Sequence, residues 1–204
     1  MPLQNRVDPE GNIHFSPARG TFMGNRGCLH TDAKEIRRTS KRDAWVTCLL
    51  EFKDRQRVLM EPGKYTELFF LDEATALAAG HRPCATCRPL RYKAFMAAWG
   101  SANQPGVAVK PADVDAQLKQ DRKPLARERI ANLNGLPEGV MVKHIANGTI
   151  YLLHAGKAYP WSFQGYAAAS APNTLQGPFL ILTPASTVAT LRQGYRPELH
   201  PSAR

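Results

Sequence analysis

Two cysteines, Cys84 and Cys87, stand three positions apart within the segment GHRPCATCRP at residues 80–89. Thiolates with this spacing can bind one tetrahedral ion from a single tight turn. The pair lies between two predicted helices, whereas a thioredoxin-like redox pair precedes its helix within a βαβ unit. The spacing therefore predicts half of a metal site, and the fold must bring the remaining ligands to this turn from elsewhere.

The residues around the pair form a clear local pattern. Residues 67–71 (ELFFL) read as a strand, and Asp72 is a good N-cap for a helix over residues 73–79 (EATALAA). Gly80 stands where a C-cap glycine belongs, and Pro83 fixes the approach to the cysteines. A second helix is expected over residues 90–99, where one apolar stripe marks a core-facing side.

The rest of the chain predicts further short elements. We expect a strand at 21–23, a hairpin formed by 45–52 and 58–60, and a helix over 113–120. Two apolar runs at 140–145 and 149–154 flank Asn147-Gly148, the strongest hairpin signal in the chain. Strands at 158–163 and 179–183 follow, and Ser186 is expected to cap a last helix that ends before Gly194.

These elements predict an α+β protein in two parts. Residues 1–20 are rich in Pro, Gly and Asn and form an extended lead-in. Residues 21–100 form a small metal-stabilised module of strands and two helices, and 101–106 is a linker. Residues 107–204 form a β-rich, barrel-like domain.

The formal net charge of +10 favours an anionic partner, most often a nucleic acid. The excess is spread along the chain and is densest at residues 37–42 (RRTSKR). No apolar run is long enough to span a membrane, and the first residues form no signal peptide. We therefore expect a cytoplasmic protein, in which the four cysteines stay reduced and serve as metal ligands or core thiols.

Residues 71–74 (LDEA) and 79–89 (AGHRPCATCRP) resemble the second half of the zinc domain of the Ada DNA-repair methyltransferases. In that family a strand leads to a helix with an EA start and then to an RPC-x-x-C turn. Residues 24–26 (GNR), followed by His30, are similar to the start of related modules that are often attached to nucleases. The resemblance covers about residues 21–99, and it implies a bound Zn²⁺ with His30 as the first ligand.

The remaining ligand is left open between two cysteines. These families place a second ligand about four residues after the first, but Lys34 occupies that position here. Cys48 lies in a predicted strand, and Cys28 would face the same side of an extended chain as His30. We favour the set His30, Cys48, Cys84 and Cys87, with Cys28 as the alternative to Cys48. Four cysteines without a histidine form a third option.

His81 stands where the related modules carry an aromatic residue, so we interpret it as a packed side chain. The FCRPSC and PCHR segments of the Ada family are absent, which argues against methyl transfer. Asp113 and Asp115 are two apart and would diverge on a helix, and we find no G-x-S-x-G, P-loop or H-E-x-x-H motif. The sequence therefore predicts no catalytic residue.

The favoured function is nucleic-acid binding, with DNA preferred, by a protein in which zinc is structural. A basic surface would contact the phosphates. The residues expected to form it are Arg26, Arg37, Arg38, Lys41, Arg42, Arg82, Arg88 and Arg91. The alternatives are a metal-dependent nuclease or DNA-repair enzyme, and a protein-interaction module with no nucleic-acid role.

Overall fold

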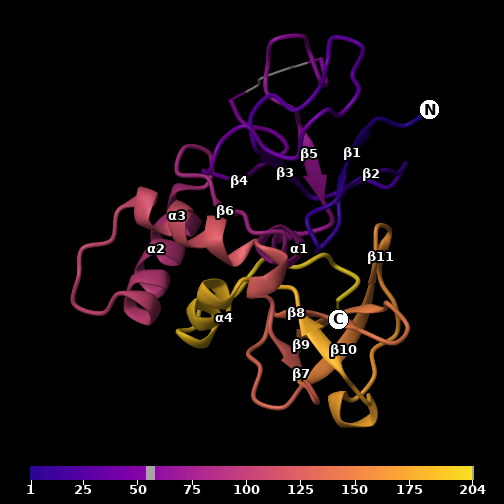
Figure 1. The fold of residues 1–204 in the computed structure, drawn as a ribbon, viewed down its shortest axis with the longest axis vertical. Coiled ribbons are helices and arrows are strands. Elements are labelled where there is room, and N and C mark those ends of the chain that lie inside the picture. Colours follow the sequence, from indigo (N-terminus) through magenta and orange to yellow (C-terminus); the bar gives the residue numbers. More distant parts are fainter. Residues whose placement is uncertain (54–57, 204) are drawn as a thin grey trace.

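The computed structural model describes residues 1–53 and 58–203, and over these ranges the chain forms two six-stranded β-sheets with four α-helices (Figure 1). The mixed α+β class expected from the sequence is confirmed. The first sheet comes from the N-terminal half and the second from the C-terminal half. Helix α1 (Glu73–Ala78) lies between them (Figure 1).

The first sheet has the strand order β2-β1-β5-β3-β4-β6. Its strands are β1 (Gln4–Val7), β2 (Ile13–Phe15), β3 (Phe22–Asn25), β4 (Val46–Cys48), β5 (Leu68–Phe70) and β6 (Arg82–Pro83). Strand β3 pairs antiparallel with both β4 and β5, and β6 pairs parallel with β4. The lead-in at 1–20 thus contributes the two strands at one edge of this sheet.

The second sheet has the order β11-β10-β9-β8-β12-β7. Its strands are β7 (Arg129–Ile130), β8 (Met141–His144), β9 (Ile150–His154), β10 (Lys157–Ser162), β11 (Gly165–Tyr166) and β12 (Phe179–Ile181). The predicted hairpin of β8 and β9 is confirmed, with Gly148 at φ +75° in its turn. Glycine reaches this left-handed conformation without the steric cost that a Cβ imposes.

Every residue of α1 is buried, which is unusual for so short a helix. Ala76 packs in a cluster with the first sheet, Ala74 packs in a cluster with the second, and Leu77 packs with Phe95 and Val114 of the following helices. Its alanines and Leu77 are covered by apolar clusters, and its buried Glu73 is paired with Arg88 and Arg91. The Asp72 side chain caps it by accepting from the Thr75 N–H at 2.9 Å, as the sequence predicted.

The other helices form a layer beside the second sheet. They are α2 (Pro89–Asn103), α3 (Pro111–Asp121) and α4 (Ala185–Arg192). Phe95 and Trp99 of α2 are buried in one cluster with residues of α3, α4 and the second sheet. The expected cap of α4 was wrong. Ser186 does not cap it; instead the Asp121 carboxylate of α3 accepts from the Ser186 N–H and hydroxyl.

The hairpin expected over 45–52 and 58–60 was also wrong where the structure describes it. Only Val46–Cys48 is a strand, and Val58–Met60 is not. Strand β4 pairs with β3 and β6 instead, which flank it in the sheet. The connection expected at residues 54–57 lies outside the described residues. Among the helices that the structure describes, none combines the length and the apolar sequence needed to cross a bilayer.

Candidate metal centre and basic residues

Cys48 and the C-x-x-C turn meet because β4 and β6 run side by side. Thr47 of β4 is paired with Pro83 of β6, and the Cys84 N–H donates to the Thr47 carbonyl at 2.9 Å. Cys48 is the last residue of β4, and Cys84 is the first residue after β6. The Arg88 N–H donates to the Cys84 carbonyl at 3.0 Å and closes the turn that carries Cys87.

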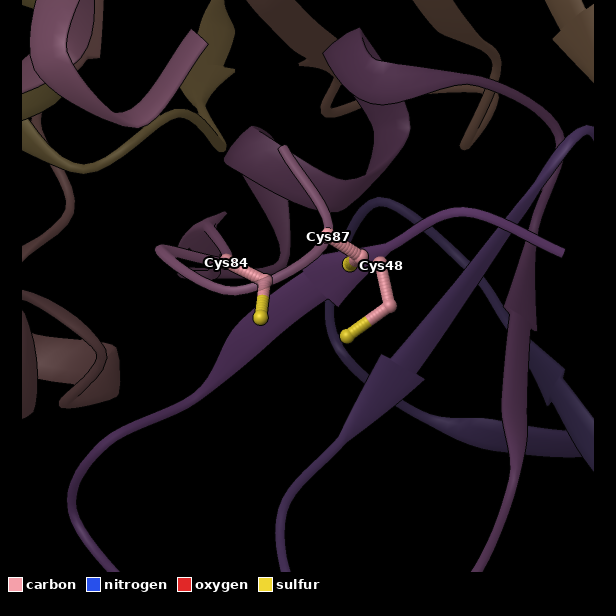
Figure 2. A group of neighbouring side chains, drawn as sticks. All are labelled: Cys48, Cys84 and Cys87. Atoms are coloured by element: carbon pink, nitrogen blue, oxygen red, sulfur yellow. The ribbon is translucent and has the colours of Figure 1, made fainter. Parts of the chain in front are cut away.

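The three sulfur atoms lie within 4.8 Å of one another (Figure 2). A tetrahedral zinc ion, with Zn–S bonds of about 2.3 Å, holds its sulfur ligands about 3.8 Å apart. The donor set is purely thiolate, and all three side chains are partly exposed. The cluster therefore fits a tetrahedral thiophilic ion with little movement of the chain.

Hydrogen bonds and burial shift the pKa values of the three thiols in different directions. The pKa of the Cys84 thiol is lowered to about 4, because its sulfur accepts from Cys48 and from the backbone N–H groups of Cys87 and Thr86. The bond with Cys84 raises the pKa of Cys48, and burial adds to this effect. Burial also raises the pKa of Cys87. Cys84 is therefore the first of the three to become a thiolate.

Two buried arginine side chains, each paired with carboxylates, brace the turn from either side. The Arg82 guanidinium makes a bidentate contact with Asp115 of α3, with N–O distances of 2.8 and 2.7 Å. On the other side, the Arg88 guanidinium pairs with Glu73 of α1 at 3.0 Å and with Glu198 at 3.1 Å. The cysteines are thereby held against two helices and against the C-terminal segment.

A cavity of about 690 Å³ borders the three cysteines. Its lining includes Arg42, Glu67 and Phe69, together with apolar side chains such as Leu49. Cavities of this size accommodate small molecules. Any ion held by the cysteines would therefore be reachable from this cavity.

His30 and Cys28, the other ligand candidates, are not among the groups that meet at the cluster. The His30 Nδ1 atom lies 2.6 Å from the Thr66 hydroxyl, and its Nε2 atom lies 3.2 Å from the Glu61 carbonyl oxygen. The Cys28 thiol donates to the His30 carbonyl at 3.8 Å. Both residues line a separate cavity of about 560 Å³. The structure thus places Cys48, Cys84 and Cys87 together and His30 and Cys28 apart from them.

His81 is fully buried and packs edge-on against Phe70, with ring centroids 4.7 Å apart. Its Nε2 atom accepts a hydrogen bond from the Arg26 Nε–H at 3.2 Å. Burial, together with the positive charges of Arg26 and Arg122, holds the pKa of His81 well below its usual value. A neutral imidazole is therefore built into the core of the first sheet.

The eight basic residues expected at the surface divide into two groups. Arg26, Arg82 and Arg88 are buried, and Arg91 is half-buried and pairs with Glu73 at 2.9 Å. The other four are exposed, and we call them the basic segment: Arg37, Arg38, Lys41 and Arg42.

The backbone of the basic segment is anchored. The Arg37 N–H donates to the Leu29 carbonyl, and the Lys41 N–H donates to the Arg26 carbonyl. Across the ranges 1–53 and 58–203, no carboxylate lies within ion-pair distance of these four side chains. Their charges are therefore free to meet an external anion.

Asp113 and Asp115 have structural roles. The Asp113 carboxylate accepts from the Lys110 N–H at 2.9 Å at the start of α3, and Asp115 pairs with Arg82. Sequence reasoning missed Asp115, Glu73 and Glu198 as partners of the basic residues, because these pairs join positions up to 110 residues apart. No local pattern in the sequence signals such pairing.

No protein-family model matches the chain, and comparisons with curated proteins and with solved structures give no significant match either.

Proposed function

We propose that this protein binds one zinc ion through Cys48, Cys84 and Cys87, and that the ion stabilises the junction between β4 and the turn after β6. The observation that carries the proposal is the convergence of three sulfurs from two separate chain segments. Thiolate ligands suit zinc, and a bound ion contributes directly to folding. The motif resemblance to the Ada zinc domain supports the same assignment for Cys84 and Cys87.

The proposed ion has three protein ligands among the described residues. Structural zinc sites usually have four protein ligands, whereas sites with three keep one position for water or another molecule. Since the cysteines line the 690 Å³ cavity, a molecule in that cavity would take the fourth position. Zinc in this protein would then stabilise the fold and remain accessible.

Metal analysis of single-residue variants tests the site. The purified protein is expected to contain one zinc per chain, and Cys48→Ser, Cys84→Ser and Cys87→Ser are each expected to lose it. The drop in affinity should exceed the roughly 10–100-fold that removal of an outer-shell partner causes. Cys28→Ser and His30→Gln are the matched controls and should retain full zinc. Zinc loss in a folded control variant, with retention in Cys48→Ser, would contradict the assignment.

Nucleic-acid binding is our second proposal, and the exposed basic segment favours it. Its four cations have no carboxylate partner within the described ranges, so a phosphate backbone can meet all four at once. Because four of the eight expected residues are buried or half-buried, the surface available is smaller than the sequence indicated. DNA is the preferred target, and the rival is an interaction module whose charge serves only solubility.

A salt titration of duplex DNA binding distinguishes nucleic-acid binding from the rival interaction module. With at most four phosphate contacts, the slope of log K against log salt should be about −3 to −4. The double variant Arg37→Gln/Arg38→Gln should make this slope less negative by about 2. Lys157→Gln, an exposed residue on the second sheet, is the control and should leave the slope unchanged. Affinity that does not respond to salt would exclude phosphate recognition.

A further inference from the structure

Arg26 is a fully buried cation, and residues 1–53 and 58–203 supply no counter-ion to it. Its Nη1 donates to the Gly11 carbonyl at 2.9 Å and its Nε donates to His81, but its Nη2 finds no hydrogen-bond partner among the described residues. Within the part of the chain that the structure describes, no carboxylate forms an ion pair with it. Buried charges in proteins are normally paired, because an unpaired one costs far more than its contacts return.

The surroundings of Arg26 add positive charge. The guanidinium carbons of Arg26 and Arg122 lie 3.9 and 4.0 Å from the centre of the Trp45 ring. Burial and the repulsion by Arg122 lower the pKa of Arg26 to about 9, although Asp8 opposes this. Asp8 is itself engaged by Asn12 and His14. Two guanidinium groups thus face one aromatic ring, and nearby carboxylates, Asp115 first, partly offset the charge of Arg122.

A small cavity of about 90 Å³ lies beside these groups. Arg26, Arg122 and Arg127 all line it, so three guanidinium groups surround one small space; we call it the arginine cavity. Donors on its wall include Asn12 and Thr39. The hollow lies where the first sheet, the end of α1 and the segments after α3 and β12 come together.

Two carboxylates, Glu10 and Asp121, stand on the wall with the three guanidinium groups, and both already have partners. Glu10 lies 2.9 Å from the Lys143 ammonium and 3.9 Å from the Arg127 guanidinium. Asp121 accepts from Ser186 and from the Gln117 side chain. The Arg122 guanidinium donates to the backbone carbonyls of Gly80 and Asp43. The cavity therefore keeps an excess of positive charge and an unused N–H donor.

We propose that the arginine cavity binds a tetrahedral oxyanion of the phosphate type. Planar guanidinium groups bind phosphate oxygens through paired, charge-assisted hydrogen bonds, and an oxyanion would supply the missing acceptor for Arg26 Nη2. The small volume limits the occupant to a single oxyanion group, either free phosphate or the terminal phosphate of a monoester. This site is separate from the cysteine cluster and does not depend on the zinc proposal.

Thermal unfolding of the full zinc-loaded chain tests the proposal. Melting temperatures are measured in phosphate and in chloride at equal ionic strength, with phenyl phosphate as the monoester. Above its Kd, phosphate should raise the Tm by roughly 3–5 °C for each tenfold increase in concentration. A response to phosphate alone identifies the free ion as the ligand, and a response to phenyl phosphate as well identifies a terminal phosphate. Equal Tm values in phosphate and chloride would overturn the proposal and leave water as the occupant.

Variants locate the binding. Arg26→Lys keeps the charge but loses the guanidinium. The phosphate concentration needed for a given rise in Tm should increase at least tenfold in this variant. Arg127→Gln is the second variant, since Arg127 is only partly buried and its loss is less damaging to the fold. Arg129→Gln is the control, because Arg129 is exposed and does not line the cavity. An undiminished response in Arg127→Gln, or a response abolished by Arg37→Gln/Arg38→Gln, would refute the location. Zinc content measured on the same samples keeps the two proposals distinguishable.

Discussion

Arginine side chains near the cysteines have internal partners, and this changes how the charge of the protein is understood. Arg82 and Arg88 flank the C-x-x-C turn in sequence, yet their guanidinium groups are buried against Asp115 and Glu73. Arg26 is buried, and the described residues offer it no such partner. At the scale of single residues, the net charge of +10 therefore overstates the cationic surface available to a ligand.

The buried His81 predicts a pH dependence of stability. Its pKa in the folded protein lies well below that of the unfolded chain, about 6.5. The unfolded chain therefore takes up a proton first, so the stability from neutral His81 is present above pH 6.5 and is lost as the pH falls. The loss should be about 1.4 kcal/mol per pH unit below 6.5.

The measurement is the free energy of unfolding in urea between pH 7 and pH 5, for the wild type and for His81→Phe. The variant keeps an aromatic ring beside Phe70 but cannot titrate. It should show a shallower dependence on pH, even though loss of the bond with Arg26 lowers its stability overall. Identical slopes for the two proteins would show that His81 is not held neutral in the fold.

The sequence could reveal a site residue where a short local pattern pointed to it. Cys84 and Cys87 follow from their spacing in one turn, and Cys48 was favoured because its predicted strand could border that turn. His30 and Cys28 were candidates through resemblance and alternation, and these say nothing of distance. The structure separates both from the cluster, since His30 is engaged by Thr66 and Glu61.

At the scale of secondary-structure elements, the same distinction holds. Helix α1 and the β8–β9 hairpin carry their own capping and turn residues, and both were predicted correctly. The hairpin after Trp45 was not, because β4 pairs with β3 and β6, and these partners come from segments on either side of it in sequence. Pairing between distant strands depends on the whole sheet.

Arg82 and Asp115 join two elements, β6 and α3, and their pair predicts a large effect of mutation. Asp115→Asn leaves a buried guanidinium without its counter-charge and should destabilise the protein by about 3–5 kcal/mol. Because β6 leads directly into Cys84, zinc affinity should also fall roughly 10–100-fold.

Asp43→Asn is the matched control for that change. Asp43 pairs with Lys119, and both side chains are more than half exposed, at 56% and 54%. Such exposed pairs contribute about 0–1 kcal/mol, so little change is expected in either measurement. Urea unfolding and competition with a zinc chelator give the two readouts. Equal effects of the two substitutions would show that the Arg82–Asp115 pair does not brace the C-x-x-C turn.

At the scale of the whole molecule, the two halves share one interior. Leu77, Phe95 and Trp99 come from the predicted zinc module, yet they pack in one cluster with Val114, Leu191 and the second sheet. Every face of α1 is covered, by one sheet or the other or by the helices. Integration of this kind makes independent folding of the halves unfavourable.

A fragment test follows from this shared interior. Residues 21–100, prepared with zinc, should show no cooperative unfolding transition, because Phe95 and Trp99 would be exposed without their partners. The full chain should unfold in one transition, with the same midpoint from fluorescence and from circular dichroism. A fragment that melts cooperatively at the midpoint of the full chain would establish an autonomous domain.

The carboxylate of Glu73 sits at the meeting point of distant parts of the chain. It forms an ion pair with Arg88 and accepts hydrogen bonds from the Tyr195 hydroxyl and the Glu198 N–H. Glu198 lies 110 residues after Arg88. On the ribosome, Cys84 and Cys87 therefore emerge long before the segment that completes their support. Capture of the proposed ion by the nascent chain would be reversible at first and would become durable only once residues 195–198 have been synthesised and have reached Glu73.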